Sequence, residues 1–161
     1  MTVTINKENL TKLADGLAQL PAMAGFDMGE FREGGRLDPR PREDALEAAN
    51  VCNTAACAIG WGPTIPGLEA TRDDLSLAGI GKFRINWNKY SDRLFISSVQ
   101  SSAWDWCFDC EWQLYDNTVT GAIKRIRYLV DKGVPPRWFQ LGVFEDFNRD
   151  LYREALAGYS A

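Results

Sequence analysis

Apolar residues recur every three or four positions in several segments of this chain, and this spacing constrains its fold more than any other feature. In the first such segment they are Leu10, Leu13, Ala14, Leu17 and Leu20. The spacing places these side chains on one face of a helix, with Asn6 as its cap and Pro21 just beyond its end. A second amphipathic helix is predicted from a cap at Asn117 or Thr118 to Gly133.

Two further segments are predicted to be helices. Residues 101–115 carry Trp104, Phe108 and Trp112 along one stripe, which indicates a largely buried helix. The last helix is predicted to bury Phe144, Phe147, Leu151, Ala155 and Leu156. We expect the packing centre to combine the aromatic segment 104–112 with the small residues of 52–61, which Asn53 or Thr54 could cap as a short helix.

The segment 83–97 has a different pattern. Apolar and polar residues alternate over 83–87, Asn88–Asp92 is typical of a turn, and a second apolar run covers 94–96. This pattern predicts a small β-hairpin near 83–97. We therefore expect a mainly α (α+β) protein, a compact helical domain of about five or six helices with one small hairpin.

The length and composition indicate one globular domain over residues 1–161. Hydrophobic residues make up 45% of the chain and charged residues 25%, which is ordinary for a folded protein. A chain of this length buries about two thirds of its unfolded surface. It therefore needs neither a disulfide nor a metal ion to fold.

The ends and the charge of the chain bear on location and partners. Residues 1–8 lack the apolar run of a signal peptide, and no stretch approaches a membrane span. We expect a cytoplasmic protein with reduced thiols and no membrane partner. The net charge of -4 argues against nucleic acid as a partner, because phosphates require a cationic surface.

The absence of histidine excludes several catalytic chemistries. The 161 residues contain none, so neither Ser-His-Asp nor Cys-His catalysis is available. A phosphate-binding loop is also missing. Gly79–Lys82 contains a Gly-Lys pair, but Ser76 and Phe83 occupy the positions of the required glycine and hydroxyl residue.

Four cysteines allow one metal hypothesis. They are Cys52, Cys57, Cys107 and Cys110. Four thiolates would suit zinc. The second pair lies in an apolar aromatic segment, where cysteine behaves as a small hydrophobic residue. Buried free thiols are therefore the favoured interpretation, and no cofactor is expected.

Paired carboxylates are the other candidates for chemistry. They are Asp73 with Asp74, Asp105 with Asp109, and Glu145 with Asp146. General acid–base catalysis needs one carboxyl with a shifted pKa in a cleft. Helix-dipole compensation explains the first and third pairs, and the second pair fits the polar edge of a buried helix. We therefore assign no catalytic residue.

Two groups of residues are candidates for a ligand or partner surface. Trp87, Tyr90 and Arg93 surround the predicted hairpin. Arg125 belongs to a basic stripe formed by Lys124, Arg125, Arg127 and Lys132. Such a stripe can meet phosphates or an acidic partner, although it is also typical of the solvated face of a helix.

Two motifs carry a resemblance to a known family. Cys52–Trp61 resembles the C-G-T-x-A-C-x-x-G-W core, and Asp116–Ile126 the D-N-T-x-x-G-A-x-x-R-I segment, of small uncharacterised bacteriophage and prophage proteins. The chain has Asn53 where that family has glycine. After glycine, asparagine is the residue that best tolerates a positive φ. The resemblance covers most of residues 8–136 and implies a phage or prophage accessory protein, which as a phage product would act in the cytoplasm of the host cell.

These observations lead to one expected function and two alternatives. We expect a non-enzymatic binding protein that sequesters or inhibits a host factor or metabolite, with anti-defence action as one form. Its partner would be a host or phage protein or a small metabolite, and a homo-oligomer stays open. The alternatives are a carboxylate-based enzyme acting on nucleotides or nucleic acid, and a structural zinc module that uses all four cysteines as ligands.

Overall fold

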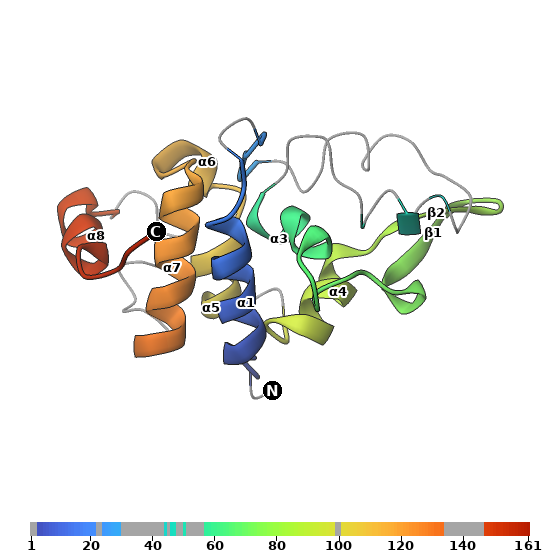
Figure 1. The fold of residues 1–161 in the computed structure, drawn as a ribbon, viewed down its shortest axis with the longest axis horizontal. Coiled ribbons are helices and arrows are strands. Elements are labelled where there is room, and N and C mark those ends of the chain that lie inside the picture. The colour runs from blue at the N-terminus through green and yellow to red at the C-terminus, as the bar shows by residue number, and fades with distance from the viewer. Residues whose placement is uncertain are drawn as a thin grey trace.

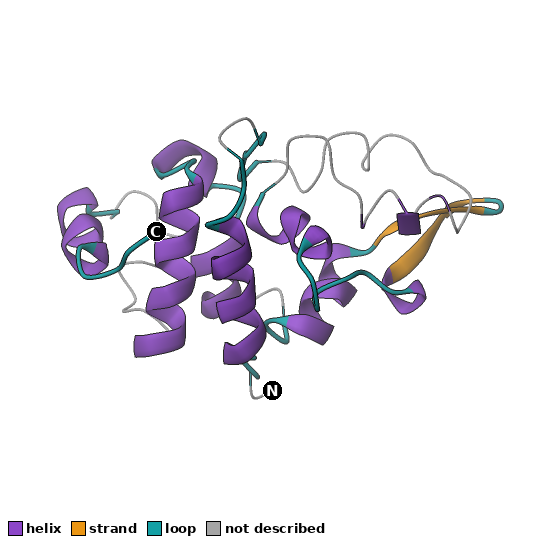
Figure 2. Cartoon of the chain, viewed as in Figure 1, coloured by secondary structure: helices purple, strands orange, loops and turns teal. Residues whose placement is uncertain are grey.

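Helices α1 (Lys7–Leu17) and α7 (Val119–Lys132) lie side by side in the middle of the molecule (Figure 1). The computed structural model describes residues 3–21, 24–29, 44, 46–47, 50, 57–98, 101–133 and 147–161. Helix α5 (Ser102–Phe108) packs on α7, and α3 (Ala58–Trp61) packs on α1. A two-stranded sheet projects from the end of the molecule away from α7 (Figure 2).

The two predicted amphipathic helices are confirmed together with their caps. The Asn6 side chain accepts a hydrogen bond from the backbone N–H of Asn9 at 3.0 Å and starts α1. The Thr118 hydroxyl accepts one from the N–H of Gly121 at 2.9 Å and starts α7. Gly133, with φ of 83°, follows the end of α7, because glycine adopts a positive φ without strain.

The predicted single helix over 101–115 is wrong in one respect. The structure divides it into α5 and the short α6 (Trp112–Tyr115). Asp109 leaves the helical conformation at φ -60° and ψ 137°, and its side chain accepts a hydrogen bond from the Glu111 N–H at 2.8 Å. Aspartate often breaks a helix in this way, because its carboxylate competes for backbone donors. Trp104, Phe108 and Trp112 are nevertheless all buried, as expected.

A mainly helical fold with one small hairpin is confirmed, and the hairpin lies earlier in the chain than 83–97. Strands β1 (Leu75–Gly79) and β2 (Lys82–Ile85) pair antiparallel around Ile80 and Gly81. The predicted turn falls instead in helix α4 (Trp87–Leu94), which Asn86 caps. Of the predicted second strand, Leu94 ends this helix and Ile96 makes an isolated antiparallel bridge with Ile5. The helix prevails because Tyr90 and Leu94 are four residues apart and both reach the core.

The last helix begins later than predicted, and most of the residues predicted to be buried there do pack against the core, with Leu151 as the exception. Helix α8 (Arg149–Leu156) begins after Asn148, whose side chain accepts hydrogen bonds from two backbone N–H groups. Tyr152 and Leu156 are buried, whereas Leu151 is 41% exposed. Leu151 is therefore not part of the inner face, and Phe144 lies outside the described residues.

The small-residue segment contributes to the core where it is described. Cys57 and helix α3 are buried, and Trp61 donates its indole N–H to the Gly25 carbonyl at 3.0 Å. The short 3-10 helix η1 (Gly62–Thr64) follows directly. Asn53 and Thr54, the predicted caps, lie outside the described residues. No helix in the described part of the chain combines the length and apolar content needed to span a membrane.

Candidate functional site

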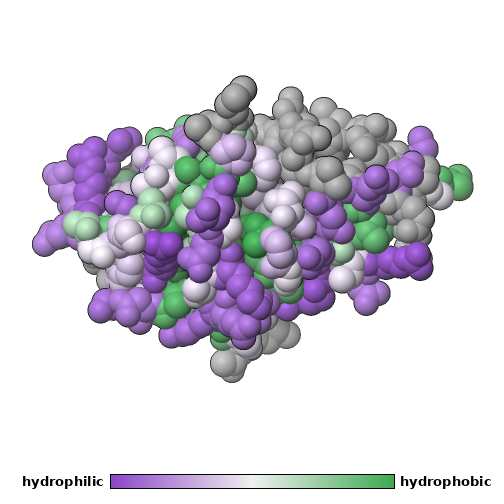
Figure 3. Space-filling model, viewed as in Figure 1, coloured by the Kyte–Doolittle hydropathy of each residue, from purple (hydrophilic) through white to green (hydrophobic). Residues whose placement is uncertain are grey.

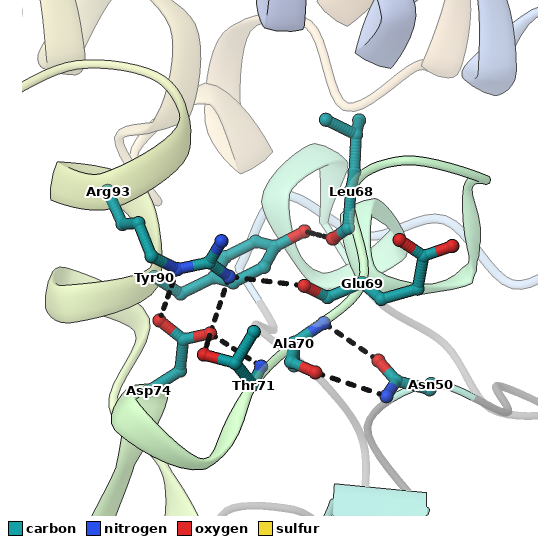
Figure 4. Close-up of polar contacts among 8 residues, drawn as sticks. All are labelled: Asn50, Leu68, Glu69, Ala70, Thr71, Asp74, Tyr90 and Arg93. Atoms are coloured by element: carbon teal, nitrogen blue, oxygen red, sulfur yellow. Dashed lines mark hydrogen bonds and ion pairs between the residues drawn. The ribbon is translucent and has the colours of Figure 1, made fainter.

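The base of the hairpin is held by an ion pair between Arg93 of α4 and Asp74 of the 3-10 helix η2 (Arg72–Asp74) (Figure 4). Arg93 donates from Nε to Oδ1 at 3.0 Å and from Nη2 to Oδ2 at 2.6 Å. Asp74 is buried, and its Oδ2 also accepts hydrogen bonds from the backbone N–H and the hydroxyl of Thr71. The buried carboxylate is therefore well paired, which a buried charge requires.

The segment that leads into the hairpin is fixed along its length by side chains from two other parts of the chain (Figure 4). The Tyr90 hydroxyl donates to the Leu68 carbonyl at 2.5 Å, and Arg93 Nη2 donates to the Glu69 carbonyl at 3.1 Å. Asn50 bonds both to the N–H of Ala70, at 2.8 Å, and to its carbonyl, at 3.3 Å. The hairpin thus starts from an ordered base.

The structure brings together the three residues predicted to form a surface around the hairpin. Trp87, Tyr90 and Arg93 all lie on α4, with the Trp87 and Tyr90 rings edge to face at 5.8 Å. The Arg93 guanidinium lies 5.7 Å from the centre of the Tyr90 ring. Tyr90 is fully buried and its hydroxyl bonds to the Leu68 carbonyl, so its predicted place on a binding surface is wrong. The polar groups of Tyr90 and Arg93 therefore hold the base of the hairpin.

Beyond this base the hairpin carries exposed apolar side chains. Leu75 packs at the base and is 6% exposed, while Leu77 is 70% exposed and Ile80, at the turn, is completely exposed. Figure 3 shows hydrophobic atoms at this outer end of the molecule. Sequence reasoning missed Leu77 and Ile80. The available signal was an apolar residue between two glycines at a hairpin turn, since turns usually carry polar residues.

The face of the hairpin that is opposite Phe83 and Ile85 is basic. Lys82 and Arg84 are exposed and alternate along β2 with Phe83 and Ile85, so the two pairs point to opposite faces. The segment 75–91 contains no acidic residue, although the chain as a whole has a net charge of -4. The hairpin therefore combines a basic face with apolar side chains at its outer end.

The predicted basic stripe on α7 needs a correction at Arg125. This residue is fully buried, because its guanidinium stacks on the Trp112 ring at 4.0 Å and lies against Tyr152 and Asp116. Arg125 Nη1 donates to the Tyr152 hydroxyl at 2.9 Å and lies 3.5 Å from Asp116 Oδ2. Tyr152 in turn donates to Asp116 at 2.6 Å. Arg125 therefore joins α7 to α8 inside the molecule.

The contacts around Arg125 account for several of the residues in the segment Asp116–Ile126. Asp116 accepts hydrogen bonds from the hydroxyls of Tyr152 and Thr118, and Thr118 caps α7. A Cβ atom on Gly121 would overlap the Asp116 carboxylate. Arg125 Nε and Nη2 have no hydrogen-bond partner among the described residues, although buried donors are usually paired. These residues act as one structural unit at the start of α7.

The described cysteines do not gather into a metal site. Cys57 and Cys107 are buried and Cys110 is exposed, while Cys52 lies outside the described residues. Burial raises the pKa of the Cys57 thiol to about 12 and that of Cys107 further still. Among the described residues, no three side chains of the metal-ligating types come together to hold an ion.

The paired carboxylates have different environments. Asp74 is the structural partner of Arg93, and Asp73 is exposed. Burial, with repulsion from Asp109 and Glu111, raises the pKa of Asp105 to about 6. Glu145 and Asp146 lie outside the described residues.

No family model, curated protein or solved structure matches this chain.

Proposed function

We propose that this chain is a non-enzymatic binding protein and that its β1–β2 hairpin is the element that docks on the partner. The observation that carries the proposal is the complete exposure of Ile80 at the turn, together with the exposure of Leu77 on β1 of the same hairpin, whose base is held by hydrogen bonds. Exposed apolar side chains at one place are typical of an interaction surface. An ordered base reduces the conformational entropy lost on binding.

The shape of this element favours a macromolecule as the partner. Small metabolites are bound in concave sites that bury most of their surface, whereas Leu77 and Ile80 stand out on a projecting hairpin. The partner proposed here is therefore a protein. The resemblance over Cys52–Trp61 and Asp116–Ile126 supports a phage or prophage origin. On that basis the protein would sequester or inhibit a host factor, for example one that acts in defence.

Affinity capture with matched variants tests this proposal. Leu77→Ser/Ile80→Ser removes the apolar end of the hairpin, and Leu114→Ser changes a leucine of α6 that is 72% exposed. The wild type and the Leu114→Ser variant should recover the same protein from a bacterial host lysate in a saturable manner. The double variant should lose it while keeping the wild-type circular dichroism spectrum. Equal recovery by all three proteins, or recovery of nothing, would contradict the proposal.

One observation supports the carboxylate enzyme as a second candidate. The pKa of Asp105 is raised to about 6 by burial and by its acidic neighbours, and a general acid needs a carboxyl that is protonated near neutral pH. Hydrolysis of nucleotides and short oligonucleotides by the wild type should then be lost in Asp105→Asn. Equal rates with the two proteins, or no turnover by either, would exclude Asp105 as a general acid and leave the binding function as the proposal.

A further inference from the structure

We propose that Arg125, Asp116 and Trp112 form a concealed binding site for a small aromatic hydroxy acid, and that Tyr152 of α8 occupies this site in the structure as an internal ligand. The inference goes beyond the proposed function, because the site lies between α7 and α8 and involves no residue of the hairpin. It follows from the contacts of Tyr152 and from two hydrogen-bond donors of Arg125 that Tyr152 leaves unpaired.

Tyr152 is held in the way that a bound phenol would be. Its ring lies against the Trp112 ring, with the ring centres 5.2 Å apart and the planes 31° from parallel. Its hydroxyl donates to Asp116 Oδ2 at 2.6 Å and accepts from Arg125 Nη1 at 2.9 Å. Aromatic contact combined with a few placed polar groups is how proteins bind small aromatic ligands. The site therefore already recognises a ring that carries a hydroxyl group.

Tyr152 does not satisfy the whole guanidinium of Arg125. Arg125 is fully buried, and its Nε and Nη2 have no hydrogen-bond partner among the described residues. These two nitrogens form one edge of the guanidinium, and this edge matches the two oxygens of a carboxylate. Arg93 uses the same two nitrogens to bind the Asp74 carboxylate at 3.0 and 2.6 Å. The donors that Arg125 leaves unpaired are therefore those suited to a carboxylate.

The charges at the site select the ligand. Asp116 Oδ2 lies 3.5 Å from Arg125 Nη1 and accepts the Tyr152 hydroxyl. A ligand that replaces Tyr152 must also donate to Asp116, because a buried charge needs hydrogen-bond partners. It must in addition offer an anionic acceptor to Nε and Nη2 of Arg125. A hydroxyl and a carboxylate on one ring meet both requirements, whereas phenol lacks the anion and benzoate lacks the donor.

An outward movement of α8 would give access to the site. This helix lies at the outer end of the molecule and packs on α7 (Figure 1). Tyr152 and Leu156 are its buried residues, and its other side chains are exposed or half-buried. The movement therefore uncovers few apolar side chains of α8 while it takes Tyr152 out of the site. A ligand that binds this open form shifts the population towards it.

Two small molecules of the same shape test the inference on the full chain. They are meta-hydroxybenzoate and its uncharged analogue meta-hydroxybenzamide. Calorimetry should show that the carboxylate binds at least about tenfold more tightly than the amide. In an NMR spectrum the Arg125 Nε–H signal should shift when the carboxylate is added, because Nε gains an acceptor. Equal affinities for the two compounds, or no binding of either, would overturn the inference.

Three variants locate the binding. Tyr152→Phe removes the hydroxyl that competes with the ligand, so it should tighten binding of meta-hydroxybenzoate by about threefold or more. Tyr159→Phe is the matched control, because it removes a hydroxyl that bonds to Asp131 near the end of α7, and it should bind as the wild type does. Arg125→Lys keeps the cation but loses the paired donors, so it should weaken binding by about tenfold or more.

The variants also define what would contradict the site. Unchanged affinity in Arg125→Lys would show that meta-hydroxybenzoate binds elsewhere. Affinity in Tyr152→Phe that is no tighter than in Tyr159→Phe would show that Tyr152 does not compete with the ligand. Circular dichroism should confirm that all three variants keep the helical content of the wild type.

Discussion

Arg93 and Asp74 form a two-pronged ion pair that joins helix α4 to the 3-10 helix at the base of the hairpin. The carboxylate of Asp74 is buried, whereas the Arg93 side chain is 36% exposed. The partly exposed Arg93 side chain therefore holds the buried Asp74, and with it the start of the hairpin, against α4.

Removal of Arg93 should destabilise the protein and loosen the hairpin. Arg93→Ala leaves a buried carboxylate whose remaining bonds among the described residues are those to Thr71, so we expect the free energy of unfolding to fall by about 2 kcal/mol. Urea denaturation measures the loss, and amide exchange of β1 and β2 should become faster. Lys89→Ala, at an exposed position on the same helix, should change neither. An unchanged stability in Arg93→Ala would show that the pair contributes little.

The buried Arg125 should be coupled energetically to Asp116. Arg125→Met removes the cation that faces the Asp116 carboxylate, so we expect a loss of about 3 kcal/mol in unfolding free energy. Arg125→Met/Asp116→Asn should lose less than the single variant, because no unpaired charge remains. A double-mutant cycle should give a coupling of about 1 kcal/mol or more. Simple additivity of the two changes would contradict the contact between them.

Gly121→Ala should destabilise the protein although it lies inside a helix. Alanine is normally about 1 kcal/mol better than glycine at such positions. Here its Cβ would overlap the Asp116 carboxylate, and Asp116 is held by Tyr152 and Thr118. We expect a lower melting temperature. Gly158→Ala is the control, because no described atom lies within 4 Å of the added Cβ and its melting temperature should not fall.

The raised pKa of Asp105 makes one contribution to stability that falls as pH rises. The folded protein holds this proton up to about pH 6, whereas an unfolded aspartate loses it near its ordinary pKa. The contribution is complete below the unfolded pKa and is lost as pH rises through 6. Asp105→Asn should therefore be more stable than the wild type at pH 7, by on the order of 1 kcal/mol after solvent screening. Urea titrations at pH 4 and pH 7 should show the difference shrink in acid.

The cysteines should differ sharply in reactivity. Cys110 is exposed, whereas burial raises the pKa of Cys57 to about 12 and suppresses the thiolate of Cys107 as well. Iodoacetamide at pH 8 should alkylate Cys110 in the folded protein and reach Cys57 and Cys107 only after unfolding, as read by peptide mass spectrometry. Protection of Cys110 that a chelator removes would instead support the zinc module with four cysteine ligands.

Helices with strong local signals could be predicted from the sequence. Asn6 and Thr118 cap α1 and α7 because an oxygen at that position reaches the N–H three residues later. Leu10 and Leu13 are buried because helical spacing puts them on one face. Each of these features depends on residues a few positions apart.

Predictions were wrong where local signals competed. Asp109 had the spacing of a helical stripe, yet its carboxylate bonds to the Glu111 backbone and ends α5. Asn86 precedes a segment with both turn-like and helical features, and the burial of Tyr90 and Leu94 decides for a helix. Tertiary packing often overrides a weak local preference in this way.

The mainly helical class and the ends of the strongest helices follow from local sequence, because capping and periodicity act over a few residues. Which side chains meet water depends instead on tertiary packing. Arg125 is buried because Trp112 and Tyr152 surround it, and Ile80 is exposed because the hairpin extends beyond the helices. The burial of a side chain depends on its neighbours in space, and residues distant in the sequence supply them.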